Sequence, residues 1–219
     1  NFWKGTLALA LLYNKQNKDD EALKYFHKSV RLNPQDNISY SFLISHYYRI
    51  KDNQRVKSLI MEALRNGIQN IEFYNLLGVV YSEEEDYLKA AEIFKASIKV
   101  KDSSAARFYL GIMYDKLEMP DKMMEEMKQS ISIEPNNALA LNYLGYSYLV
   151  QDINLQEALT LIQRACKLDP ENGAFLDSLG WAYYKHGKYR QASKYLNKAA
   201  TLEKDAEVYE HLGHLYLVL

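Results

Sequence analysis

The stretch LDSLGWAYY, Leu176–Tyr184, places a glycine beside a tryptophan within a pattern that is otherwise typical of a helix. Glycine inside a helix costs about 1 kcal/mol relative to alanine, so Gly180 needs a structural reason. The order leucine, small residue, two others and tyrosine recurs along the chain, with Ile44 as the one large exception at the small position. The copies are Leu9…Tyr13, Leu43…Tyr47, Leu77…Tyr81, Leu110…Tyr114, Leu144…Tyr148, Leu179…Tyr183 and Leu212…Tyr216. Successive tyrosines are 34, 34, 33, 34, 35 and 33 residues apart, which identifies an internal repeat.

A second set of residues follows each tyrosine at helical spacing. A small or modest residue comes first, a larger apolar residue four positions later, and another small residue three positions after that. The three series are Ala22, Val56, Ala90, Met123, Ala158 and Ala192; Phe26, Ile60, Phe94, Met127, Ile162 and Leu196; and Ser29, Ala63, Ser97, Ser130, Ala165 and Ala199. Such spacing marks one face of a helix, so each unit is predicted to be two helices joined by short turns. The glycine then allows the second helix to approach the first.

The sequence resembles the tetratricopeptide repeat (TPR) family, and the sixth unit, GAFLDSLGWAYYKHGKYRQASKYLNKA, carries most of the family pattern. The resemblance implies an all-α, right-handed α-solenoid of antiparallel helix pairs, the TPR superhelix. We expect a single array over residues 1–219. Its predicted repeats are 3–36, 37–70, 71–103, 104–137, 138–172 and 173–205, followed by the first helix of a seventh at 206–219. The sequence of the last two units resembles that of bacterial TPR proteins, many of which work in envelope assembly or secretion.

Departures from the repeat pattern predict local differences. Ile44 and Val56 replace both small residues of the second repeat, so its helices should lie farther apart. The methionines of EMPDKMMEEM should pack more softly, because methionine fills irregular gaps. Pro120 is expected to start a helix. The fifth repeat has one extra residue within VQDINLQEAL, which we expect in its inner turn.

Composition excludes several classes of function. The chain has 219 residues with a formal net charge of −1, which is not the basic footprint of a nucleic-acid-binding domain. The apolar run LALALLY is too short to insert across a membrane, which takes about 20 residues. Cys166 is the single cysteine, so no disulfide forms within the chain. The sequence leaves the compartment open between the cytoplasm and the bacterial cell envelope. We read the chain as a fragment, and we expect its apolar final helix, 206–219, to be covered by another segment or by self-association.

In the TPR family the first helix of each repeat lines the concave face, so its non-core residues are the candidates for binding. The resemblance implies a partner-binding groove that becomes aromatic toward the C-terminal half. Its predicted residues are Asn75, Phe108, Asn142, Tyr146, Asp177, Trp181, Tyr184 and Lys185. Trp181 is predicted to anchor a peptide; the alternative is that these aromatic residues only pack on adjacent helices. The Lys and Asn pair of the carboxylate-clamp TPR proteins is missing, which argues against that mode of binding.

No pattern in the sequence predicts catalysis. His211 and His214 lie close to Glu207 and Glu210, but no further ligand accompanies them, and a solvated helix face is the favoured interpretation. GYSYL lacks the second glycine of a nucleophile elbow. We therefore predict no enzyme activity, no cofactor and no metal. The predicted function is a scaffold that binds a peptide or helix of a partner protein; the alternative is a docking domain of a larger enzyme or of an envelope or secretion assembly.

Overall fold

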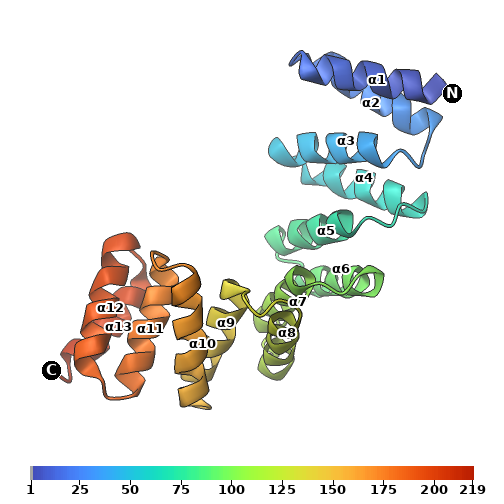
Figure 1. The fold of residues 1–219 in the computed structure, drawn as a ribbon. Coiled ribbons are helices and arrows are strands. Elements are labelled where there is room, and N and C mark those ends of the chain that lie inside the picture. The colour runs from blue at the N-terminus through green and yellow to red at the C-terminus, as the bar shows by residue number, and fades with distance from the viewer. Residues whose placement is uncertain (1) are drawn as a thin grey trace. The chain divides into compact units, whose positions relative to one another are not determined.

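The protein is described by a computed structural model that covers residues 2–219, and these residues form α-helices and no strand (Figure 1). The helices are α1 (Phe2–Lys15), α2 (Asp19–Leu32), α3 (Asn37–Arg49), α4 (Asn53–Arg65), α5 (Ile71–Glu83), α6 (Tyr87–Val100), α7 (Ser104–Lys116), α8 (Pro120–Ile133), α9 (Ala138–Val150), α10 (Leu155–Leu168), α11 (Gly173–Lys185), α12 (Tyr189–Leu202) and α13 (Ala206–Tyr216). The predicted all-α fold is confirmed.

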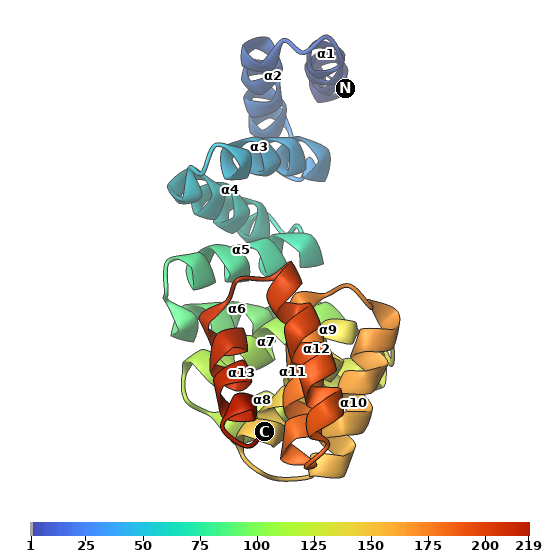
Figure 2. The same ribbon diagram turned by 90° about the vertical axis from the view of Figure 1, so that its left-hand side faces the viewer.

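The chain divides into two compact units, Asn1–Lys101 and Asp102–Leu219. In the first, helices α1 to α6 pack successively around one apolar core. In the second, α7 packs on α8, α9 on α10, and α11 on α12; Figure 2 shows the last two pairs side by side. The first helices of neighbouring pairs, α9, α11 and α13, also contact one another in turn. The boundaries of the repeats, and a single array across both units, stay predictions.

The glycines of the repeat lie where a second helix crosses the first. A Cβ atom added to Gly180 would meet Leu196 Cγ at 2.6 Å, and one added to Gly78 would meet the Phe94 ring at 2.7 Å. Gly111 and Gly145 are equally crowded. The prediction of close helix approach is confirmed at these four positions. At Gly213 an added Cβ atom would have nothing within 4 Å, and because no second helix follows α13 in residues 2–219, the prediction stays untested there.

The turn within each helix pair follows one backbone plan. Three residues join most pairs, and the second of them has a positive φ, as at Lys51 (60°), Glu85 (60°) and Gly187 (69°). The turn between α9 and α10 has four residues, 151–154, which confirms the predicted position of the extra residue. Pro120 is the first residue of α8, also as predicted. The pair α3 and α4 packs less extensively than the other pairs, as the large side chains of Ile44 and Val56 predict.

Hydrogen bonds one repeat apart connect neighbouring pairs. Asn70 Nδ2 donates to Asn37 Oδ1 at 3.1 Å, 33 residues away. Two of the repeated tyrosines also connect neighbouring pairs, through partners 20 residues away: Tyr47 OH lies 3.1 Å from His27 Nε2, and Gln163 Nε2 donates to Tyr183 OH at 3.1 Å. These two hydroxyls therefore meet the second helix of the preceding pair. These hydrogen bonds thus help to hold neighbouring helix pairs together, and with them the face that the first helices form.

Candidate functional site

A cavity of about 750 Å³ lies in the second unit, against the face formed by α9, α11 and α13. Residues of α7, α8 and the loop before α13 complete its wall. The apolar part of the lining includes Met123, Val150 and Val208, with the rings of Tyr143 and Tyr146. Ligand pockets in proteins commonly enclose about 300–1,000 Å³, so the cavity is of a size that holds several side chains of a partner.

Asp177 and His211 form a buried pair beside this cavity. His211 Nδ1 lies 2.9 and 3.0 Å from the two carboxylate oxygens of Asp177, and both residues are 5% exposed. A buried carboxylate is costly without a donor, and the imidazole N–H provides one. The pair joins α11 to α13 and fixes the orientation of the His211 ring.

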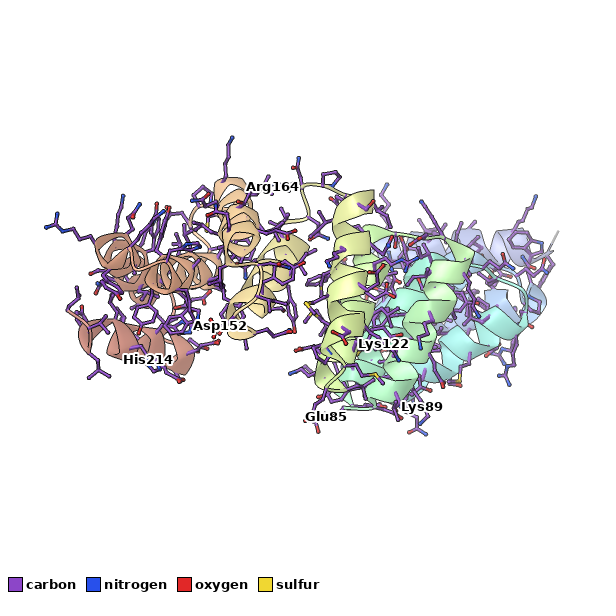
Figure 3. All side chains as sticks on the ribbon, turned by 90° about the horizontal axis from the view of Figure 1, so that it is seen from below. Glu85, Lys89, Lys122, Asp152, Arg164 and His214 are labelled. Atoms are coloured by element: carbon purple, nitrogen blue, oxygen red, sulfur yellow. The ribbon has the colours of Figure 1, made fainter. Side chains whose placement is uncertain are left out.

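Trp181 lies against that ring. Its ring centre is 4.2 Å from His211, with 14° between the planes, and 4.6 Å from Tyr184, with 6°. Lys185 Nζ lies 5.4 Å from the Trp181 ring centre and pairs with Asp152 at 2.6 Å. Asp152 is labelled in Figure 3, at the turn that follows α9. Trp181, Tyr184 and His211 therefore form one stacked aromatic cluster.

Two tyrosines of α9 hold carboxylates at the cavity. The Tyr146 hydroxyl donates to Glu207 of α13, and the Tyr143 hydroxyl donates to Asp115 at 2.6 Å. Burial raises the pKa of each phenol above its ordinary value, and the adjacent carboxylate raises it further. Both hydroxyls therefore stay protonated in neutral solution and remain hydrogen-bond donors to these carboxylates.

Asn142 has an unusual environment for a polar residue. Its side-chain oxygen, Oδ1, is buried and has no hydrogen-bond partner, and the residue lines the cavity. An unpaired buried acceptor costs about 1–3 kcal/mol. Such an atom is a point at which a bound group with an N–H would relieve that cost.

The predicted site residues do not all lie together. Asn142, Tyr146 and Asp177 line the cavity. Trp181 and Tyr184 belong to the aromatic cluster, which adjoins the cavity through His211, and Lys185 lies beside Trp181. Phe108, in the same unit, is 8% exposed and packs edge-on against Tyr143, so it offers little surface. Asn75 belongs to the first unit, where it accepts a hydrogen bond from Ser97 Oγ at 2.6 Å. Their roles in binding stay predictions.

His211 is the member of this site that the sequence analysis missed. It was considered only as a metal ligand together with His214, but its Nδ1 faces Asp177, and His214 lies farther along α13 (Figure 3). One signal was available: Asp177 and His211 are 34 residues apart, the period of the repeat, on successive first helices. A carboxylate and an imidazole at that spacing can meet between neighbouring repeats.

Residues 2–219 can also be assessed for a metal site, a membrane-spanning helix and a reactive cysteine. Within this range no three His, Cys, Asp or Glu residues gather as a metal site would require, and no helix is long and apolar enough to cross a membrane. Cys166 is buried, and its Sγ donates to the carbonyl of Phe175 at 3.2 Å. Burial raises the pKa of this thiol to about 12, so it is not a nucleophile at neutral pH.

Comparison with known proteins places these features in a family. Two family models of the tetratricopeptide repeat match the chain, one over residues 6–38 and the other over residues 71–103, 105–137 and 175–205. Together these residues make up more than half of the chain. The TPR repeat-containing protein PA4667 of Pseudomonas aeruginosa is 33% identical over 144 residues, which are 65% of this chain and 24% of that protein. The chain thus spans about a quarter of the length of this relative.

Two solved structures share the fold. The PilF protein of Pseudomonas aeruginosa has a TM-score of 0.78 at 13% identity, covering 97% of this chain and 96% of that one. YrrB, described as a TPR protein with an unusual peptide-binding site, has a TM-score of 0.69 at 21% identity, covering 86% and 97%. The repeat pattern, the helix pairs and these matches agree, and the chain belongs to the tetratricopeptide repeat family.

Proposed function

We propose that this chain is a protein-interaction scaffold whose second unit, residues 102–219, holds an extended segment of a partner protein in the cavity beside α9, α11 and α13. The observation that carries the proposal is this cavity itself, which combines apolar walls, half-buried tyrosine rings and a buried acceptor without a donor. TPR domains are typically binding scaffolds, and YrrB shares the fold and is described by its peptide-binding site. This similarity supports a peptide as the occupant.

The aromatic cluster suits the anchoring role predicted for Trp181. Its ring is only half-buried, so one part remains accessible while Tyr184 and His211 fix its orientation. Ordering a mobile side chain on binding costs about 0.5–1.5 kcal/mol. A side chain that is already ordered avoids most of this cost. Tryptophan and tyrosine are also the residues most often found at energetic centres of interfaces.

A variant that fills the cavity tests the proposal. Val150 is 61% exposed, lines the cavity and ends α9; Val100 is exposed and ends α6 in the other unit. We expect Val150→Trp to reduce the recovery of bound partner proteins at least about tenfold in a quantitative pull-down with the intact protein. The matched variant Val100→Trp should leave recovery unchanged.

The Trp181→Ala, Tyr184→Ala double variant should lose the same partners as Val150→Trp. Thermal unfolding followed by circular dichroism checks that all variants are folded. If folded Val150→Trp keeps the wild-type partners in wild-type amounts, the cavity is not the binding site. If it loses them while the aromatic variant keeps them, the cavity stands and Trp181 is not an anchor.

A docking domain of a larger protein is the second candidate. The chain matches only a small part of its relatives, such as 18% of the Drosophila melanogaster Protein O-mannosyl-transferase Tmtc3. In such relatives the matching segment is one part of a larger protein, and this favours the second candidate. In that case the cavity would hold substrates of the larger protein. The identity of the proteins lost from Val150→Trp separates the two: substrates that are turned over indicate docking, and stable subunits indicate a scaffold.

A further inference from the structure

The cavity of the second unit is negatively charged, although the whole chain is nearly neutral. Its lining contains five carboxylates and no lysine, arginine or histidine; the carboxylates are those of Asp115, Asp177, Glu203, Asp205 and Glu207. Asp177 is paired with His211. In the described part of the chain the other four are in no ion pair with a basic side chain. No described basic side chain therefore lies within ion-pair distance of these four carboxylates.

The hydroxyl donors of the lining are already used inside the protein. Tyr143 and Tyr146 donate to Asp115 and Glu207. Ser147 donates to the Tyr143 carbonyl at 2.8 Å and Ser178 donates to the Ala174 carbonyl at 3.0 Å. An ionised carboxylate accepts hydrogen bonds and donates none. An occupant that brings donors of its own therefore matches these acceptors.

Asn142 is a second and independent observation in the same direction. Its buried Oδ1 has no donor within the protein. It lies on α9 one turn before Tyr146, whose hydroxyl holds Glu207. Asn142 and the five carboxylates thus place hydrogen-bond acceptors on residues that line one cavity.

The apolar lining defines the rest of the occupant. Met123 is buried, and the Tyr143 and Tyr146 rings are half-buried, so the wall between the acceptors is apolar. Lysine and arginine combine an aliphatic stem with a charged donor group, and they bury the stem while the head meets an acceptor. Arginine and lysine bonded to carboxylates form hydrogen bonds about twice as strong as neutral ones.

We propose that the partner segment held in this cavity is basic, with a lysine or arginine side chain directed to Asp115 and Glu207 and an N–H group directed to Asn142 Oδ1. This inference rests on the proposed function, because it names the chemical class of the segment bound at the same site. Charge complementarity of this kind increases the rate of association and selects the partner more than it sets raw affinity.

Peptides of defined charge test the inference. A random library of 12-residue peptides is selected on the wild-type protein of 219 residues, and the bound peptides are sequenced. We expect enrichment of lysine and arginine. Each arginine of a selected peptide is then replaced by citrulline, which has nearly the same shape and no charge. Fluorescence anisotropy should show affinity at least about tenfold weaker for the citrulline peptide, and weaker binding of the arginine peptide at 300 than at 50 mM NaCl.

Protein variants locate the effect. Asp115→Asn with Glu207→Gln keeps both tyrosine hydrogen bonds and removes two charges, and should lower affinity for the arginine peptide about tenfold. The control, Glu125→Gln with Glu157→Gln, removes two exposed carboxylates of the same unit outside the cavity and should leave affinity nearly unchanged. Equal effects of the two double variants would overturn the proposal, since they would reflect net charge alone.

The outcomes also separate this inference from the proposed function. If the selected peptides are neutral or acidic and Val150→Trp abolishes their binding, the cavity binds peptides and the basic occupant is wrong. If no peptide of any charge binds, both proposals fail. If arginine peptides bind equally to wild type and to Val150→Trp, their site lies elsewhere and this inference fails.

Discussion

Asp177 and Trp181 are four residues apart in α11 but have different roles in the folded chain. Asp177 is buried and is committed to His211, whereas the Trp181 ring stays half-exposed beside the same histidine. The Asp177 carboxylate lines the cavity and also orients the His211 ring on which Trp181 stacks. Within the quoted stretch LDSLGWAYY, Gly180 has a third role, because it accommodates α12.

Gly180 allows a prediction with a matched control. Alanine at this position would place its Cβ atom 2.6 Å from Leu196 Cγ and 3.0 Å from the Leu196 backbone nitrogen, so α12 must move. Overpacking of this kind costs about 1–3 kcal/mol, partly offset by about 1 kcal/mol from the better helix propensity of alanine. We expect Gly180→Ala to lower the free energy of unfolding by up to about 2 kcal/mol, measured by urea denaturation.

Gly213 occupies the same repeat position and has open space around it. Gly213→Ala should therefore raise the free energy of unfolding by up to about 1 kcal/mol through helix propensity alone. The explanation by helix crossing would be refuted if the two variants shifted the urea midpoint in the same direction.

At the scale of elements, substitutions in the turns within helix pairs measure the cost of backbone strain without a change in packing. Gly187 has a φ of 69° and nothing within 4 Å of an added Cβ atom, so Gly187→Ala adds strain without a clash. A left-handed backbone costs a non-glycine residue about 1–2 kcal/mol, and we expect a loss of stability of about 1 kcal/mol in urea denaturation. Gly5→Ala, which also adds no contact but lies within α1, should be neutral or stabilising.

Glu118 occupies the equivalent place in another turn, with a φ of 57°. Glu118→Gly should raise stability by up to about 1 kcal/mol, because relief of strain exceeds the entropy that glycine adds to the unfolded chain. A loss of stability in Glu118→Gly, together with no loss in Gly187→Ala, would show that φ does not control these turns.

These elements also show what the sequence could predict. Repeat spacing located the helix pairs, Pro120 marked the start of α8, and the extra residue was placed in the turn after α9, because each depends on local chemistry. The contact between Asp177 and His211 was not predicted, because His211 lies on another first helix, 34 residues along the chain. The acidic cavity was missed for a similar reason: Glu203 and Asp205 belong to a loop, and only the folded chain brings them beside Asp115.

At the scale of the whole molecule, stability should be local. Within each unit the principal helix contacts join successive helices or the first helices of neighbouring pairs. In an array of neighbour contacts the effect of a local defect decreases with distance along the chain, and segments open with different free energies. A defect between α11 and α12 should therefore leave residues 1–101 nearly unaffected.

Hydrogen exchange measured by mass spectrometry tests this locality with two equivalent defects. Gly180→Ala should increase amide exchange in α11, α12 and their neighbours in the second unit, while the exchange of residues 1–101 stays at its wild-type rate. Gly78→Ala, which directs a Cβ atom at the Phe94 ring, should produce the reverse pattern. Gly213→Ala controls for the substitution itself. Faster exchange across all 219 residues in either defect would instead mean that both units unfold as one cooperative structure.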